Sequence, residues 1–180
     1  MVTDMSNAKS INLEIRRATV GDAGACIEHA TRVIEEFPDN LSFAPGEFDY
    51  TLEYEQNLFA EVAASDNSVF LLALVDDQIV GLLNYTGGKR QSLRHAAVLG
   101  ISVRKAWCNQ GVGTALLQAA IAHARAGGVI KRLELAVYAH NARAIHVYQK
   151  LGFHQEGRRQ NAVCKNGRYF DDLIMALLLD

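Results

Sequence analysis

The chain has 180 residues and a net charge of −2 at pH 7; 49% of the residues are hydrophobic and 21% are charged. This length suits one domain with a sizeable core, and the near-neutral charge gives no general attraction to nucleic acid or to an anionic membrane. No apolar run approaches the roughly 18 residues of a spanning helix, and the polar start does not resemble a secretory leader. We therefore expect a cytoplasmic protein with a flexible tail over residues 1–10 and one domain over residues 11–180.

The cysteines and histidines do not predict a metal site. The three cysteines lie far apart in the sequence, and their odd number without short pair spacing argues against both a disulfide framework and a zinc site. The histidines also lack the spacing of metal ligands. We expect reduced thiols and no bound metal.

The first part of the domain has the pattern of a strand followed by two helices. Residues 11–17 alternate apolar and polar side chains, as a half-buried strand does. Thr19 and Asp22 have the spacing of a helix-capping pair, and apolar residues then recur at helical spacing until Pro38. A weaker helical pattern covers about residues 48–64. Its expected buried residues are Leu52, Leu58, Phe59 and Val62.

The next segment predicts an antiparallel meander. Two apolar runs, residues 68–75 and 78–85, flank the pair Asp76-Asp77, which suits a tight hairpin turn. Residues 93–103 form a third, longer strand pattern. The side chains expected on one face of it are Ala97, Leu99, Ile101 and Val103.

The second half alternates helices and strands. After a turn at residues 107–113, a helical apolar stripe runs from Leu116 to Ala124 and ends at Gly127-Gly128; the strand pattern 132–137 follows, which predicts a right-handed parallel crossover. Asn141 is suited to cap a further helix that ends at Gly152. Two last strand patterns surround Asn166-Gly167, a strong hairpin motif. The order predicts an α/β fold with one mixed, mostly antiparallel sheet flanked by helices.

The turn "WCNQGVGTAL", residues 107–116, places Gly111 and Gly113 between a strand and a helix. The first amides of a helix have no internal partner, and without glycine side chains over them they make an anion site, so we predict a bound phosphate. A dinucleotide-binding turn would need a third glycine at position 116, which is Leu116, and a triphosphate-binding loop would need a lysine at position 114, which is Thr114. The sequence therefore matches neither of these two nucleotide-binding motifs.

Three segments, "ISVRKAWCNQGVGTALL", "LELAVYAHNARAIHVYQKLGF" and "EGRRQNAVCKNGRYFDDLIMALLL", together resemble the GCN5-related N-acetyltransferase (GNAT) superfamily. The resemblance covers about residues 11–179. The acetyl-CoA motif of this superfamily, Gln/Arg-x-x-Gly-x-Gly/Ala, falls on residues 108–113, with Cys108 in its first position. The resemblance implies a single-domain GNAT-like fold, a twisted sheet in which two central strands, residues 99–103 and 133–137, splay apart. Gly100 is compatible with a local bulge there.

The resemblance also implies acetyl-CoA as the cosubstrate, with its pantetheine arm in the gap between the splayed strands. Backbone amides of Ile101 and Val103 would hold this arm and help to stabilise an oxyanion, and residues 109–114 would hold the pyrophosphate. The coenzyme-binding residues that the resemblance implies are Ile101, Val103, Asn109, Gln110, Gly111, Val112, Gly113, Thr114, Asn141 and Tyr148.

Acetyl transfer to an amine needs a neutral amine and an acid for the departing thiolate. The resemblance puts Tyr148 at the acid position, although its place on an apolar helix face also fits a core tyrosine. It puts His95 where the family often has a glutamate base, and a solvated or structural histidine is the alternative there. Other candidate bases are a chain of waters or one of three glutamates, Glu35, Glu36 and Glu53.

We therefore predict an acetyl-CoA-dependent N-acetyltransferase, an acyltransferase that works by direct transfer in a ternary complex. A small primary amine or amino acid is the favoured acceptor, and a protein or peptide N-terminus is the next. The alternative from another class is a non-catalytic acyl-CoA-binding sensor or interaction module, which would keep the glycine turn and be indifferent to Tyr148 and His95. We expect no nucleic-acid or membrane partner, and a homodimer through the C-terminal strands is a family-level option.

Overall fold

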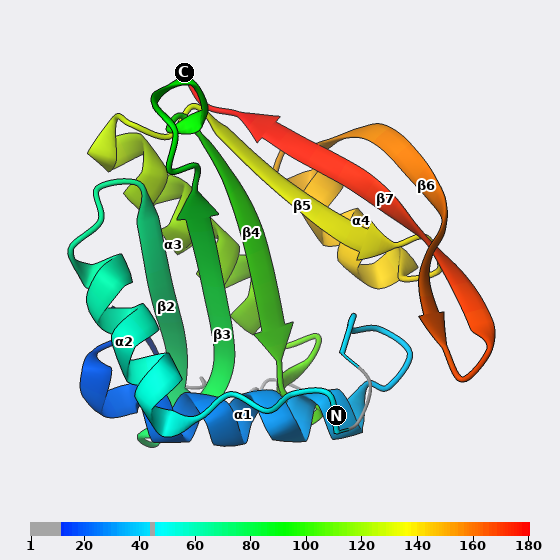
Figure 1. Ribbon diagram of the computed structural model, residues 1–180, viewed down its shortest axis with the longest axis horizontal. Coiled ribbons are helices and arrows are strands. Elements are labelled where there is room, and N and C mark those ends of the chain that lie inside the picture. The colour runs from blue at the N-terminus through cyan, green and yellow to red at the C-terminus, as the bar shows by residue number, and fades with distance from the viewer. Residues whose placement is uncertain (1–11, 44–45) are drawn as a thin grey trace, which may run out of the picture.

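The computed structural model describes residues 12–43 and 46–180. Over these residues the chain forms a seven-stranded sheet in the order β1-β2-β3-β4-β5-β7-β6 with four α-helices (Figure 1). The strands are β1 (Leu13–Arg17), β2 (Ser68–Val75), β3 (Gln78–Gly87), β4 (Ala96–Val103), β5 (Arg132–Tyr138), β6 (His154–Lys165) and β7 (Arg168–Leu178). The helices are α1 (Ala23–Glu36), α2 (Leu52–Ala63), α3 (Val112–Gly127) and α4 (Ala142–Lys150). The predicted α/β fold is confirmed, whereas the predicted tail and Ile11 lie outside the described residues.

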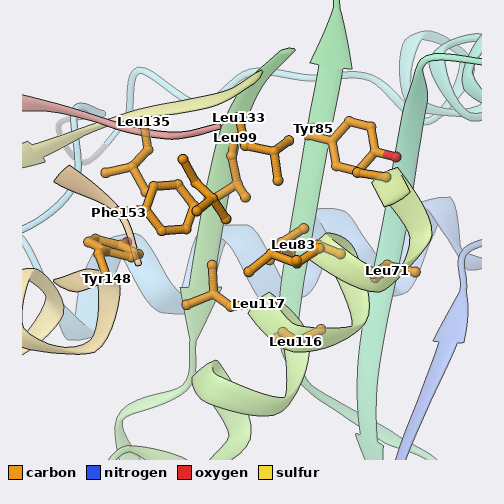
Figure 2. Close-up of a cluster of buried hydrophobic side chains, with 14 of the residues drawn as sticks. Leu71, Leu83, Tyr85, Leu99, Leu116, Leu117, Leu133, Leu135, Tyr148 and Phe153 are labelled. Carbon is orange, nitrogen blue, oxygen red and sulfur yellow. The ribbon is translucent and has the colours of Figure 1, made fainter. Parts of the chain in front are cut away.

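Helices cover both faces of the sheet. On one face, Cys26 of α1 and Phe59 of α2 pack against Leu72 of β2. On the other face, α3 and α4 contribute to a larger cluster, which includes Leu117 of α3 and Leu83 of β3 (Figure 2). The apolar stripe predicted for α3 is buried throughout, at Leu116, Leu117, Ala120, Ile121 and Ala124. In the described part of the chain, no helix has the length and apolar character needed to cross a membrane.

The sheet opens between its central strands β4 and β5. These two strands run parallel and pair through only three positions, the last of which joins Val98 to Glu134. Beyond that point β4 stays paired with β3 as far as Val103, and β5 stays paired with β7 as far as Tyr138. The halves of the sheet therefore diverge toward the carboxyl ends of β4 and β5, as Figure 1 shows, and the predicted splay is confirmed.

The short-range turn predictions are also confirmed. Asp76 and Asp77, which join β2 to β3, both have positive φ angles, 49° and 62°, as a two-residue hairpin turn of the type I′ class requires. Asn166 and Gly167 have φ angles of 49° and 76° between β6 and β7. Asn141 caps α4 as predicted, since its Oδ1 accepts a hydrogen bond from the Ala144 amide at 3.2 Å.

Four sequence-based predictions of boundaries or local details were wrong. Helix α2 begins at Leu52 rather than near residue 48, because the Thr51 side chain caps it, and Leu52 is exposed rather than buried. Strand β4 begins at Ala96, since residues 91–93 form a short 3₁₀ turn. Gly100 makes no bulge: its register with Asn84 of β3 is regular. A side chain at Gly100 would instead press on the Asn84 carboxamide, because an added Cβ would lie 3.2 Å from Oδ1.

Candidate active site

A cavity of about 750 Å³ lies where β4 and β5 separate. One part of its wall comes from the start of α3 and from α4, and another part comes from α1, α2 and residues 37–43. These two groups of elements cover opposite faces of the sheet. The opening between the strands thus joins two half-sites, one on each face of the sheet.

Strand β4 presents backbone amides to this cavity. Just after the strand, the Arg104 amide donates to the Val80 carbonyl of β3 at 2.9 Å. Because successive amides of a strand point to opposite edges, those of Ile101 and Val103 point toward the gap rather than toward β3. The pairing of β4 with β5 has already ended at Val98. An extended ligand arm can therefore bind β4 as a further strand would.

The glycine turn that precedes α3 exposes a second set of amides. Gly111 has a φ of +85°, in the left-handed region that favours glycine, and Asn109 also has a positive φ of 62°. The first hydrogen bond of α3 joins the Ala115 amide to the Gly111 carbonyl at 2.9 Å. The amides of residues 112–114 therefore have no helical partner, and the positive end of the helix dipole lies among them. This arrangement suits a phosphate group.

The structure brings most of the predicted coenzyme residues together. Eight of the ten line the cavity, namely Ile101, Val103, Asn109, Gly111, Gly113, Thr114, Asn141 and Tyr148. Gln110 and Val112 are not in its wall: the Gln110 side chain donates to the Ala106 carbonyl at 2.6 Å, and the Val112 side chain is buried in the core. Cys108, in the first position of the motif, lines the cavity and directs its thiol to the Arg104 carbonyl at 3.6 Å.

Tyr148 lies on α4 at the border between the cavity and the core. Only 7% of it is exposed, and its ring centroid is 5.9 Å from that of Phe153 (Figure 2). Burial raises the pKa of Tyr148 to about 12. The phenol is therefore protonated at neutral pH and can donate a hydrogen bond, and Tyr148 lines the cavity.

The structure does not bring His95 together with these residues. His95 is exposed in the turn before β4, and its backbone carbonyl accepts hydrogen bonds from the amides of Lys131 and Arg132 at 2.8 and 3.1 Å. This is the end at which β4 and β5 are still paired. Val98, the first residue of β4 in the cavity wall, lies three residues further along, about 10 Å at the usual rise of a strand. The spacing along the strand did not reveal where the strands part.

The three alternative glutamates also lie outside the cavity wall. Glu35 and Glu53 are exposed. The Glu36 carboxylate accepts hydrogen bonds from Arg104 Nε at 2.8 Å and from the Lys105 amide at 2.7 Å. Glu36 therefore links the end of α1 to the segment after β4.

A different glutamate, Glu55, is in the cavity wall and was not predicted. Only 6% of Glu55 is exposed, and its Oε2 has no hydrogen-bond partner among the described residues. Glu55, Phe59 and Val62 are the buried residues of α2, at positions i, i+4 and i+7. One acidic residue on an otherwise apolar helical stripe is the sequence signal that would have indicated it.

The segment after α1 is fixed to the C-terminal hairpin. Lys165 of β6 donates from Nζ to the carbonyls of Pro38 at 2.7 Å and Phe43 at 3.1 Å, and also to that of Leu41. The Tyr138 hydroxyl donates to the Leu41 carbonyl at 3.0 Å. These bonds hold the described part of this segment to β5 and β6, and residues 40–43 line the cavity.

Comparison with known proteins gives matches over most of the chain. A family model described as the acetyltransferase (GNAT) family matches residues 32–153. L-amino acid N-acetyltransferase AaaT of Escherichia coli is 38% identical over 106 residues, 59% of this chain and 65% of that protein. The ribosomal protein uS5 alanine N-acetyltransferase of the same species is 30% identical over 113 residues, 61% of this chain and 58% of that protein. The chain thus spans less than two thirds of the length of these relatives.

Solved structures match more completely. The acetyltransferase of the GNAT family from Streptococcus pneumoniae is 34% identical and superposes with a TM-score of 0.89 over 94% of this chain and 100% of that one. The structure of yncA from Salmonella typhimurium, which contains acetyl-CoA, has a TM-score of 0.81 over 93% of this chain and 94% of that one. Its identity is 20%, so it supports the fold alone.

Proposed function

The chain belongs to the acetyltransferase (GNAT) family, and we propose that it transfers the acetyl group of acetyl-CoA to a primary amine while both substrates are bound. Acetyl-CoA supplies the acetyl group as a thioester. The observation that carries the proposal is the juxtaposition in one cavity of the free edge of β4, the bare amides at the start of α3 and the phenol of Tyr148.

The residues present fit acetyl-CoA. The amides of Ile101 and Val103 point into the gap and would bind the pantetheine arm by strand-like hydrogen bonds. The turn 109–114 would bind the pyrophosphate through backbone amides, which need no basic side chain. A Cβ atom added at Gly113 would make only ordinary van der Waals contacts, the nearest with the Val103 side chain at 3.7 Å. The approach to these amides is therefore open. Cys108 in place of Gln or Arg leaves this backbone site intact.

Tyr148 would donate a hydrogen bond to the sulfur that leaves. Its pKa of about 12 exceeds the value near 8.5 of an ordinary thiol, so full proton transfer to a thiolate is uphill. We therefore propose that Tyr148 stabilises developing charge on sulfur more than it supplies a proton. Its removal should slow the reaction by about 10- to 100-fold rather than abolish it, in line with one hydrogen bond to a charged group.

For the acceptor we propose a small primary amine or an amino acid, with a protein or peptide N-terminus as the second candidate. The first is supported by the relative that acts on L-amino acids, and the second by the relative that acts on a ribosomal protein alanine. The first candidate is also supported by residues 40–43, which line the cavity in a segment that Lys165 holds in place.

The test is thiol release from acetyl-CoA with a panel of amines, amino acids and peptides, for the wild type, Tyr148→Phe and His95→Ala. We expect turnover with at least one amine, a lower kcat for Tyr148→Phe, and a full rate for His95→Ala because His95 lies outside the cavity. Tight acetyl-CoA binding without turnover across the panel would refute the enzyme and favour the acyl-CoA sensor. A large loss in His95→Ala would restore histidine as the base.

A further inference from the structure

Glu55 is a buried acidic group to which the proposed mechanism gives no role. It is on the face of α2 that packs toward α1 and the sheet, where its neighbours on the stripe are Phe59 and Val62. Only 6% of its surface is exposed, and its Oε2 atom is fully buried without a hydrogen-bond partner among the described residues. Buried carboxylate oxygens are rarely left unpaired, because desolvation without compensation costs free energy. Because Glu55 lines the cavity, a ligand bound there is in a position to supply a partner for its carboxylate.

The groups around Glu55 do not neutralise it. Its charge acts on the Cys26 thiol of α1 and on the Tyr50 hydroxyl, and it contributes to raising the pKa of each after the larger effect of burial. Both neighbours are therefore neutral near pH 7. Burial raises the pKa of Glu55 itself, with no counteracting cation among the described residues. Of the cationic side chains in the cavity wall, Arg159 bonds to Asp172, and Arg143, at the start of α4, lies 6.0 Å from the centroid of the Phe37 ring.

The cavity around Glu55 is aromatic and apolar. Phe43, Phe48 and Tyr50 line it and contact one another, with ring centroids 5.6 Å apart for Phe43 and Phe48 and 4.7 Å apart for Phe48 and Tyr50. Leu58 of α2 and Phe70 of β2 extend the same wall. Aromatic rings receive both an apolar body and, at their faces, an ammonium group. This half of the cavity therefore suits a cation attached to a hydrophobic body.

We propose that Glu55 binds the acceptor in the ammonium form in which it arrives, before this proton is lost and the neutral amine attacks, and that the preferred acceptor is a monoamine with an aromatic or apolar body and without an adjacent carboxylate. Glu55 is then a specificity-determining residue. The inference rests on the proposed function and narrows its first candidate: it keeps small primary amines and excludes amino acids, on which one relative acts. An α-carboxylate next to the ammonium group would lie beside the buried Glu55 carboxylate and be repelled by it. A polyamine would leave its remaining charges against the apolar wall.

The experiment measures amine binding without acetyl transfer. Calorimetry in the presence of coenzyme A compares 2-phenylethylamine, 2-phenylethanol, L-phenylalanine and spermidine as ligands. The protein variants are the wild type, Glu55→Gln, which removes the charge and keeps the shape, and Glu53→Gln, which alters an exposed glutamate of the same helix outside the cavity wall. Coenzyme A affinity is measured for all three proteins as the check of folding and of the coenzyme half-site.

We expect 2-phenylethylamine to bind the wild type more tightly than the other three ligands do. Glu55→Gln should weaken this binding by about 10-fold or more, as the loss of a buried charge-assisted hydrogen bond would, while Glu53→Gln and the affinity for coenzyme A stay unchanged. 2-Phenylethanol, which has no ammonium group, should bind the wild type and Glu55→Gln equally. Equal amine binding by wild type and Glu55→Gln, or a preference for L-phenylalanine or spermidine, would overturn the inference.

The inference and the proposed function can fail separately. Thiol release with amines whose KM is the same in wild type and Glu55→Gln would refute the role of Glu55 and leave the acetyltransferase activity standing. Glu55-dependent amine binding without thiol release would support the recognition site and refute the enzyme.

Discussion

The two glycines of the turn before α3 should respond in opposite ways to substitution by alanine. Gly111 has a φ of +85°, and no atom lies within 4 Å of a Cβ added there, so the cost of alanine comes from the backbone alone. Such a conformation costs a non-glycine residue about 1–2 kcal/mol. Gly113 has no positive φ, and a Cβ there would meet Val103 at 3.7 Å and Ile101 at 4.0 Å, which are ordinary contacts. Alanine at position 113 should stabilise by about 0.4–1 kcal/mol, because it restricts the unfolded chain.

The assay is thermal unfolding of both variants beside acetyl-CoA calorimetry. For a chain of this size, 1 kcal/mol corresponds to a shift in Tm of about 2–4 °C. Gly111→Ala should therefore lower the Tm by about 2–8 °C and weaken acetyl-CoA binding, because relief of the strain turns the amides of residues 112–114 away from the ligand. Gly113→Ala should raise the Tm slightly and keep the affinity, since the family motif accepts alanine there. A Gly111→Ala variant with unchanged Tm and affinity would refute the assigned backbone role.

Two further perturbations test groups around the cavity. Burial lowers the pKa of His29 to about 4, whereas in the unfolded chain the histidine takes up its proton near pH 6.5. The contribution of His29 to the free energy of unfolding should therefore be full above pH 6.5 and be lost as the pH falls toward 4, by at most about 3 kcal/mol. Denaturation at several pH values should show a flatter stability profile for His29→Gln, and an unchanged slope would contradict the assignment. Lys165→Met should lower the free energy of unfolding by about 1–3 kcal/mol, because residues 38–43 lose the hydrogen bonds that Lys165 donates to their carbonyls. The same variant should raise the KM for the acceptor without changing the affinity for acetyl-CoA. An unchanged acceptor KM would show that this segment does not shape the acceptor site.

The elements that the sequence predicted well depend on local patterns. The stripe of α3, the hairpin at Asn166-Gly167 and the cap at Asn141 each need only residues a few positions apart, and all three are confirmed. The predicted start of α2 was wrong because the Thr51 side chain caps the helix, whereas the apolar pattern around residue 48 was weak. The capping hydrogen bond sets this boundary, and the spacing of apolar residues did not indicate it.

The placement of His95 shows what a pattern along one strand cannot contain. The point at which β4 leaves β5 is set by pairing between segments more than thirty residues apart, which ends at Val98 and Glu134. A residue before that point remains at the paired end of the sheet whatever its distance along the strand from the glycine turn. The family resemblance indicated that a cavity lies between β4 and β5, but it did not indicate how far along β4 the wall of the cavity extends.

The two halves of the cavity differ in what builds them, and this difference explains which half the sequence predicted. The half proposed for the coenzyme is built from backbone amides on β4 and α3, so a strand, a left-handed glycine and a helix start suffice to specify it. The half proposed for the acceptor is built from side chains of α1, α2, β2 and residues 40–43, which come together only in the folded chain. The sequence marks Glu55 as an acidic residue on the apolar stripe of α2, but only the fold shows that it lies in the wall of this cavity. Substitutions in the coenzyme half should therefore act through backbone geometry, whereas the choice of acceptor should change with single side chains, Glu55 first among them.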